Sequence, residues 1–166
     1  MTGDLGFLFV LLIFAGLLIA AAVEDVLHFR LSNRITLAVT FLYPAYVLTS
    51  PTPVAWGAAI VLAAVVLLVG FGLFVAGWAG GGDAKLFAAA ALWAGVAHFP
   101  EYLLATTLFG AALSLAMIAR RYWSRRLVLS TGGPSEPPRK FGQFEMPYGV
   151  AIAFGGLATA MLLSGV

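Results

Sequence analysis

Long uncharged stretches separated by short polar clusters dominate the sequence. The first stretch, Leu5 to Val23, is close to the roughly 20 residues that a helix needs to cross a bilayer. Comparable apolar stretches follow along the rest of the chain. The pattern therefore predicts an all-α protein, a polytopic membrane bundle of six transmembrane helices. These helices are expected at about 5–23, 35–49, 54–78, 83–100, 102–119 and 146–163.

Composition indicates the same class of protein. Hydrophobic residues make up 62% of the chain and charged residues only 10%, whereas a soluble domain carries about 25% charged residues. The chain has no Cys, which excludes a disulfide, a thiol nucleophile and a Cys-ligated metal. We therefore expect residues 1–166 to form a single integral membrane domain in a lipid bilayer, with no metal, no cofactor and no nucleic-acid partner.

The basic residues predict the orientation of this bundle. With six spans, three connections share one side of the membrane, and they hold all nine Lys and Arg residues. These connections are 24–34, 77–85 and 120–145. Because basic loops stay in the cytoplasm, the pattern predicts both termini outside the cytoplasm and a cytoplasmic loop at about 120–145.

A carboxylate interrupts the apolar sequence in the segment from Gly80 to Lys85. No side chain between Ile35 and Gly82 is formally charged, and Asp83 and Lys85 then occur together. An ionisable residue at a membrane span is costly to keep, so it marks a candidate functional site. The glycines before Asp83 are expected to let a backbone approach closely.

A second carboxylate is expected at the same membrane depth. Asp25 ends the first predicted span, and the predicted topology places it on the cytoplasmic side with Asp83, although 58 positions separate them. Two carboxyl groups within hydrogen-bond reach share a proton, so one can activate water while the other protonates a scissile carbonyl. Glu24 and Glu145 lie on the same predicted face, so this pairing is not unique.

Structural roles for these charges agree equally well with the composition. Asp25 can bound the first span and pair with His28 or Arg30, and Asp83 can pair with Lys85 at the interface. The residue types alone leave these alternatives open.

Two motifs resemble those of a known family. The segment Gly80-x-Gly82-Asp83-x-Lys85 resembles the G-x-G-D-x-K motif of type IV prepilin peptidases. Its G-x-G-D core is shared with other intramembrane aspartyl proteases. Asp25, followed by a basic stretch, resembles the catalytic Asp that ends the first core helix of that family.

Two further segments extend the resemblance over essentially the whole chain. Asn33 lies eight residues after Asp25, as in the family, and ends the segment Leu-Ser-Asn at 31–33 where the family has Ile-Pro-Asn. Ser32 thus replaces the usual Pro, which alters the rigidity of this turn. The segment Pro-Tyr-Gly at 147–149 opens the last predicted helix and is similar to a Pro-Tyr-Gly segment of the family.

The resemblance implies an aspartic endopeptidase that removes the short leader from prepilins or pseudopilins at the cytoplasmic face of the bacterial inner membrane. It maps the catalytic pair onto Asp25 and Asp83. The small size resembles the peptidase-only form found with Flp-type tight-adherence pili, and archaeal preflagellin peptidases are a nearby alternative. The resemblance implies substrate-binding or supporting roles for Glu24, Asn33, Gly80, Gly82, Lys85, Pro147, Tyr148 and Gly149.

Two other functions stay open on the sequence. Paired membrane carboxylates also serve proton-coupled transport, although both predicted acids lie at one face of the membrane and not at its midplane. A non-catalytic pilus assembly subunit is the other alternative, and such a protein would tolerate loss of either Asp.

Single Cys probes test the predicted orientation, because the chain has no native Cys. The Arg125→Cys variant is expected to react with a membrane-impermeant thiol reagent only from the cytoplasmic side. The Thr52→Cys variant is expected to react only from the outside. Inverted labelling of intact cells and inverted vesicles would contradict a common cytoplasmic face for the two carboxylates.

Overall fold

The secondary structure of the described residues consists of helices, with no strand among them. The structure, a computed structural model, describes residues 2–131 and 147–165. The all-α class predicted from the hydrophobic pattern is confirmed for these residues. The helices are α1 (Thr2–His28), α2 (Asn33–Thr49), α3 (Trp56–Val75), α4 (Gly81–Thr131) and α5 (Tyr148–Ser164).

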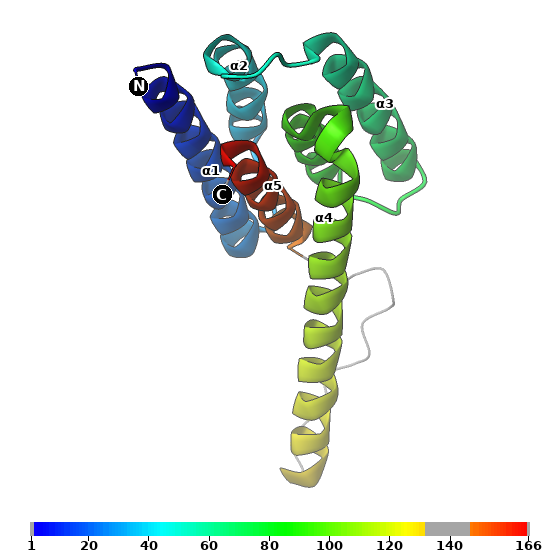
Figure 1. The fold of residues 1–166 in the computed structure, drawn as a ribbon. Coiled ribbons are helices and arrows are strands. Elements are labelled where there is room, and N and C mark those ends of the chain that lie inside the picture. The colour runs from blue at the N-terminus through cyan, green and yellow to red at the C-terminus, as the bar shows by residue number, and fades with distance from the viewer. Residues whose placement is uncertain (1, 132–146, 166) are drawn as a thin grey trace.

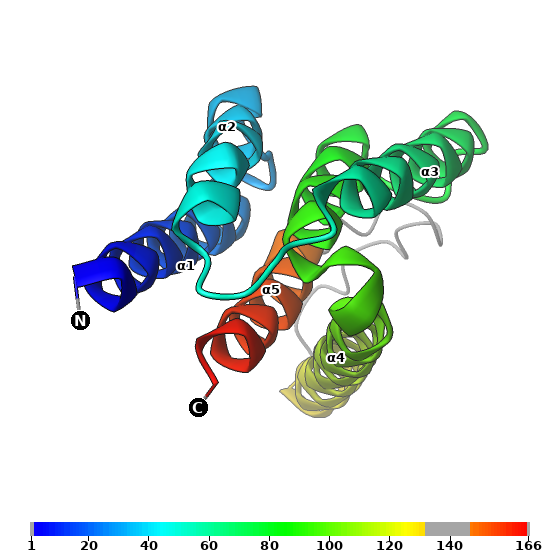
Figure 2. The same cartoon turned by 45° about the horizontal axis from the view of Figure 1, so that its top comes forward.

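The helix α5 lies between α1 and α4 (Figure 1, Figure 2). It packs against α1 on one side and α4 on the other, and α4 also packs against α2 and α3. Figure 2 shows α3 on the outside, next to the first part of α4, while α2 lies beside α1. The last helix of the chain therefore holds the first helix and α4 together.

Gly95 divides α4 into two segments that fold back on each other. Its backbone is non-helical, with φ 59° and ψ −174°, a conformation that glycine adopts readily because it has no Cβ. Phe87 and Tyr102 lie on opposite sides of this break, and 15 residues of straight helix would separate them by about 22 Å. Their ring centroids instead lie 4.9 Å apart, and the Tyr102 hydroxyl donates to the Phe87 carbonyl at 3.1 Å. Figure 1 shows the chain turning back here.

Three helices of the described chain are long and apolar enough to cross a membrane, which makes this a membrane protein. They are Leu5–His28, Trp56–Val75 and Gly81–Arg120. The helices α2 and α5 have 17 residues each, fewer than the roughly 20 that a span requires. The six-span arrangement stays a prediction.

Two boundaries predicted from the sequence are wrong. The fourth span was expected to end at Pro100, but the helix breaks at Gly95 and Pro100 lies within the second segment of α4. A glycine supplies the positive φ that this reversal needs, whereas proline, with its φ fixed near −65°, does not. The loop expected at about 120–145 begins later, because α4 continues to Thr131. Residues 132–146, including Glu145 and the expected helix start at Met146, lie outside the described residues.

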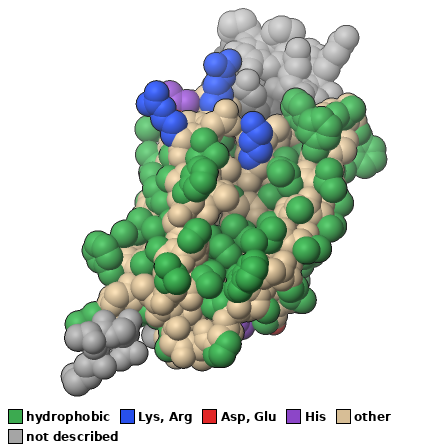
Figure 3. All heavy atoms as spheres, turned by 90° about the horizontal axis from the view of Figure 1, so that it is seen from above, with side chains coloured by type: hydrophobic (Ala, Val, Ile, Leu, Met, Phe, Trp, Pro, Cys, Tyr) green, Lys and Arg blue, Asp and Glu red, His purple; other side chains and the backbone are tan. Residues whose placement is uncertain are grey.

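The surface of the described chain separates charge from apolar side chains. On the face shown in Figure 3, Lys and Arg side chains gather at one end, and hydrophobic side chains cover much of the rest. Large apolar side chains such as Leu68 and Val75 are about 70% exposed. Such a surface suits contact with lipid, which is as apolar as these side chains.

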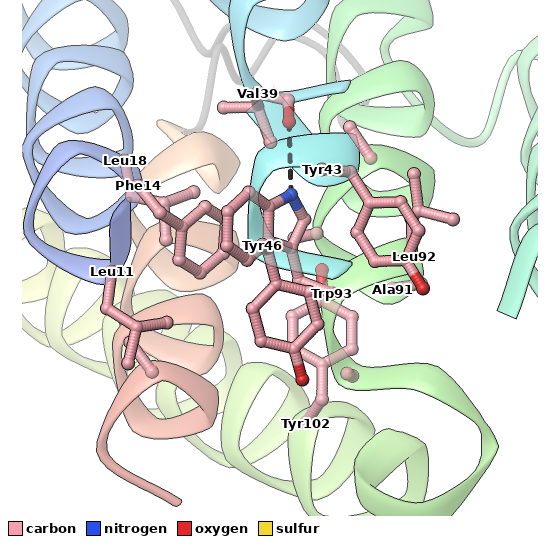
Figure 4. Packing of buried hydrophobic residues seen from close by; sticks show 14 of the residues in the cluster. Leu11, Phe14, Leu18, Val39, Tyr43, Tyr46, Ala91, Leu92, Trp93 and Tyr102 are labelled. Atoms are coloured by element: carbon pink, nitrogen blue, oxygen red, sulfur yellow. Dashed lines mark hydrogen bonds between the residues drawn. The ribbon is translucent and has the colours of Figure 1, made fainter. Parts of the chain in front are cut away.

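Trp93 joins three helices in the core. Its indole ring stacks on Phe14 of α1 with ring centroids 4.0 Å apart, and its Nε1–H donates to the Val39 carbonyl of α2 at 3.0 Å. Tyr43 and Tyr46 of α2 pack against the same indole. Figure 4 shows these rings converging on Trp93. Because the buried N–H has an acceptor, the indole fixes α1, α2 and α4 without leaving a donor unsatisfied.

Two adjacent glycines let α5 approach its neighbours. A Cβ on Gly156 would lie 2.6 Å from Cδ1 of Leu18 on α1, and a Cβ on Gly155 would overlap Thr106 Oγ1 on α4. Small residues allow helix backbones to pack closely in membranes. This close packing brings the N-terminus of α5 to the end of α1.

Replacing Trp93 tests its role in the core. We expect Trp93→Ala to lower the free energy of unfolding by about 3–5 kcal/mol, because it removes a buried ring and leaves a cavity. Trp78 is 82% exposed, so Trp78→Ala is the matched control and is expected to have little effect. Denaturation of the purified protein in detergent measures both changes. Equal losses in the two variants would contradict this account of the core.

Candidate active site

Asp25 lies in the last turn of α1 and is buried against the N-terminus of α5. Its side chain is 4% exposed, and its Oδ2 accepts a hydrogen bond from the backbone N–H of Gly149 at 2.7 Å. The Val150 N–H also interacts with this carboxyl group. The first N–H groups of a helix have no partner within the helix and favour a negative charge. The start of α5 therefore supplies backbone hydrogen-bond donors to a carboxyl group that is otherwise buried.

Gly149 can hold Asp25 in this way only because it has no side chain. A Cβ there would lie 2.8 Å from Oδ2 and 3.0 Å from Cγ of Asp25. The sequence suggested Gly149 as a supporting residue without specifying its contact. The structure brings it directly onto the Asp25 carboxyl group.

Asp83 lies in the first turn of α4 and is half-buried. An acidic side chain at this position is favoured by the helix dipole. Gly82, which precedes Asp83, packs against Leu31 in the turn that follows α1, so Asp83 lies beside the end of α1 that carries Asp25. The fold thus brings together two carboxyl groups that lie 58 positions apart in the sequence.

The glycines before Asp83 make contacts within the protein. A Cβ on Gly80 would lie 2.5 Å from Asp83 Oδ2, and a Cβ on Gly82 would lie 3.1 Å from the Leu31 Cβ. The sequence attributed both glycines to the approach of a substrate backbone. In the structure, Gly80 makes room for the Asp83 carboxyl, and Gly82 lets α4 approach the turn before α2.

Asn33 and Lys85 also come together. The Lys85 Nζ donates to the Asn33 Oδ1 at 3.1 Å, which joins the start of α2 to the first turn of α4. Within residues 2–131 and 147–165, neither Asp83 with Lys85 nor Asp25 with Arg30 forms an ion pair. The Asp83–Lys85 and Asp25–Arg30 pairs raised from the sequence are therefore not formed, whereas Asp25 does lie in the last turn of α1.

Glu24 holds the turn between α1 and α2. Its Oε2 accepts a hydrogen bond from the Ser32 backbone N–H at 2.9 Å. A proline has no N–H, so the Ser32 found where prepilin peptidases usually have Pro supplies the donor for this contact. The sequence proposed Glu24 as a substrate-binding or supporting residue, and this contact is a supporting one.

Pro147 and Tyr148 begin α5 and connect it to α4. Pro147 occupies the N-cap position of the helix. The Tyr148 hydroxyl lies 3.1 Å from where a Cβ on Gly110 would be. Sequence reasoning missed Gly110 and Leu31, because neither residue type carries a chemical signal without a known neighbour.

Comparison with known protein families decides the identity of this arrangement. The family model described as the type IV leader peptidase family matches residues 12–115. The chain belongs to the type IV leader peptidase family. The matched region contains Asp25, Asn33 and the segment 80–85, whereas 147–149 lie beyond it. No curated protein and no solved structure matches the chain.

Membership of the type IV leader peptidase family implies that the protein is a peptidase of the membrane. The described residues contain no group of three or more His, Asp or Glu side chains placed to hold a metal ion. The chemistry available at the two Asp side chains is that of proton transfer and water activation.

The contact between Gly149 and Asp25 yields a direct test. We expect Gly149→Ala to reduce leader-peptide cleavage by about 100-fold, because the new Cβ displaces the Asp25 carboxyl and small displacements of a reacting group have effects of this size. Gly57→Ala in α3 is the matched control, since nothing lies within 4 Å of its Cβ position. Cleavage assays are compared at equal levels of each protein in the membrane. Full activity of a stably inserted Gly149→Ala protein would contradict the contact.

Proposed function

We propose that this member of the type IV leader peptidase family is an aspartic endopeptidase. In this proposal it removes the leader from Flp-type prepilins or pseudopilins, at the cytoplasmic face of the bacterial inner membrane. The observation that carries the proposal is geometric: Asp25 lies in the last turn of α1 and accepts the Gly149 N–H, and Gly82, beside Asp83, packs on Leu31 in the turn that follows α1. Each carboxyl group lies against a glycine that leaves room for it.

Two adjacent carboxyl groups can hydrolyse a peptide bond without a covalent intermediate. One carboxylate takes a proton from water, and the resulting hydroxide attacks the scissile carbonyl carbon. The other, protonated group donates its proton to the carbonyl oxygen, because two neighbouring carboxyl groups share one proton. When the tetrahedral intermediate collapses, the C–N bond breaks and the leaving amine takes up a proton.

The surroundings of each Asp suit it to one of these roles. The backbone N–H of Gly149 occupies Asp25 Oδ2 and fixes its orientation. As whole residues, Asp25 is buried and Asp83 is half-buried. The Glu24–Ser32 and Lys85–Asn33 hydrogen bonds fix the turns on either side of the pair.

The position of the basic residues supports a cytoplasmic site. Arg30 and Arg34 lie in and beside the turn that follows Asp25, and Lys85 lies two residues after Asp83. Because basic ends of spans stay in the cytoplasm, both carboxyl groups belong at that face. The reversal of α4 at Gly95 supports two membrane passes within α4. If α2 and α5 also cross the membrane, the chain crosses it six times and both termini lie outside the cytoplasm.

Replacing each Asp tests the proposed mechanism. We expect Asp25→Asn and Asp83→Asn each to abolish cleavage of a co-expressed Flp-type prepilin, because Asn has nearly the same shape but cannot complete the proton cycle. The double variant is expected to be no less active than either single one, since residues that act as a unit give non-additive losses. Precursor and mature pilin are separated by size on a gel.

Glu24→Gln is the matched control for these variants. Gln keeps an oxygen that can accept the Ser32 N–H, so cleavage is expected to be close to that of the wild type. If both Asp variants stayed active, the aspartic mechanism would be wrong, and a non-catalytic assembly subunit would fit better. If Glu24→Gln alone lost activity, Asp25 would be the wrong choice of first carboxylate.

A further inference from the structure

The segment 29–33, which joins α1 to α2, is tied to the last turn of α1 by two hydrogen bonds. The Phe29 N–H donates to the Asp25 carbonyl oxygen at 2.8 Å, and the Ser32 N–H donates to Glu24 Oε2 at 2.9 Å. Glu24 and Asp25 are neighbours in the chain. Both hydrogen bonds therefore reach the turn of α1 that carries the first candidate carboxyl group.

Phe29 gives this segment a strained backbone. Its φ is 50°, in the left-handed region that bulky residues rarely adopt and that persists only where the surrounding structure holds it. Three residues later, the chain has turned back far enough for the Ser32 N–H to reach the Glu24 carboxylate, eight positions earlier. The hydrogen bond between Glu24 and Ser32 is therefore one of the contacts that hold the reversal.

The same segment also contacts the first turn of α4 at two points. A Cβ on Gly82 would lie 3.1 Å from the Leu31 Cβ and 3.6 Å from the Leu31 carbonyl oxygen, so Leu31 fills the space beside this glycine. The Lys85 Nζ donates to Asn33 Oδ1 at 3.1 Å. Gly82 and Lys85 lie on either side of Asp83 in the sequence. The segment therefore contacts the residues that flank the second candidate carboxyl group.

Other connections between α1 and α4 lie farther from Asp83. Helix α5 packs on both, but its Gly155 meets Thr106 in the second segment of α4, beyond the break. Trp93 ties the first segment to α1 and α2, yet it lies ten residues after Asp83, about 15 Å along the helix. Among the described contacts, those of the segment 29–33 therefore link the two turns most directly.

We propose that residues 29–33 form a positioning element that holds the first turn of α4 beside the last turn of α1, with Glu24 and Ser32 as its positioning residues. The proposal rests on the proposed function, because two carboxyl groups that share a proton must be kept within hydrogen-bond reach of the same substrate atoms. Glu24 acts through the Ser32 backbone, and the segment in turn acts on α4 through Leu31. Neither Glu24 nor Ser32 touches the reacting atoms.

Steady-state kinetics with a Flp-type prepilin test whether Glu24 acts on the reaction. Glu24→Leu has no acceptor for the Ser32 N–H and is expected to lower kcat at least about 10-fold with little change in KM, because small displacements of reacting groups have effects of this size. Glu24→Gln keeps an acceptor oxygen and is expected to restore most of this loss. A change confined to KM, or an equal loss of kcat in both variants, would overturn the proposal.

Ser32→Pro removes the donor of the same hydrogen bond. Ser32 has φ −73° and ψ 138°, which a proline adopts without strain, so this variant loses the N–H and keeps the backbone conformation. In a Ser32→Pro protein, Glu24→Leu is expected to cause no further loss of kcat, because residues that act through one contact are not additive. The same loss in both backgrounds would mean that Glu24 does not act through Ser32, which would overturn the proposal.

Distances between spin labels report the position of the two turns without relying on activity. Because the chain has no native Cys, labels are attached to Leu27→Cys in α1 and Trp78→Cys just before α4, at residues that are 67% and 82% exposed. Double electron–electron resonance is expected to give a narrow distance distribution in this labelled parent and in its Glu24→Gln variant. In the Glu24→Leu variant, we expect the distribution to broaden or shift.

The two readouts separate failure of this proposal from failure of the proposed function. If the wild type cleaves the prepilin and Glu24→Leu leaves the distance distribution unchanged, the positioning element is wrong while the peptidase stands. A lower kcat with unchanged distances would make Glu24 a substrate contact instead. If the wild type does not cleave the prepilin, the proposed function fails, and the distances alone then decide whether the segment 29–33 holds the two turns together.

Discussion

The Asp25 carboxyl and the first backbone N–H groups of α5 depend on each other. A buried carboxylate is costly unless hydrogen bonds compensate it, and the unpartnered N–H groups at a helix start need acceptors. The 2.7 Å hydrogen bond from Gly149 to Asp25 meets both needs at once. It also fixes the end of α1 against the start of α5. Because α1 packs on α2 and α5 packs on α4, the contact helps to position these helices as well.

This contact is accompanied by close packing of α5 on α1 and α4 at particular glycines. The approach is possible because Gly155 and Gly156 face Thr106 and Leu18 without a Cβ. At the N-terminal end of α5, the missing Cβ of Gly149 likewise leaves room for the Asp25 carboxyl group. The glycines of α5 thus determine how closely α5 can approach the Asp25 carboxyl group of α1.

The reversal of α4 places the second carboxyl group. Because α4 folds back at Gly95, its first segment packs between α2 and α3 while its second segment packs on α5. The first turn of the first segment carries Asp83 to the turn that follows α1, where Gly82 packs against Leu31.

The helical class, the membrane setting and the identity of the two candidate Asp residues follow from the pattern of residues along the chain. Long uncharged stretches admit no other class in lipid, and an isolated charge such as Asp83 is visible against them. The resemblance of the 80–85 and 147–149 segments also indicated which residues should meet. How these residues meet is visible only in the folded protein. Gly149 donates its N–H to Asp25, Glu24 holds Ser32, and α4 turns at Gly95 and not at Pro100. These contacts join backbone atoms, or need the absence of a Cβ at a particular distance, and a one-dimensional pattern of side chains records neither.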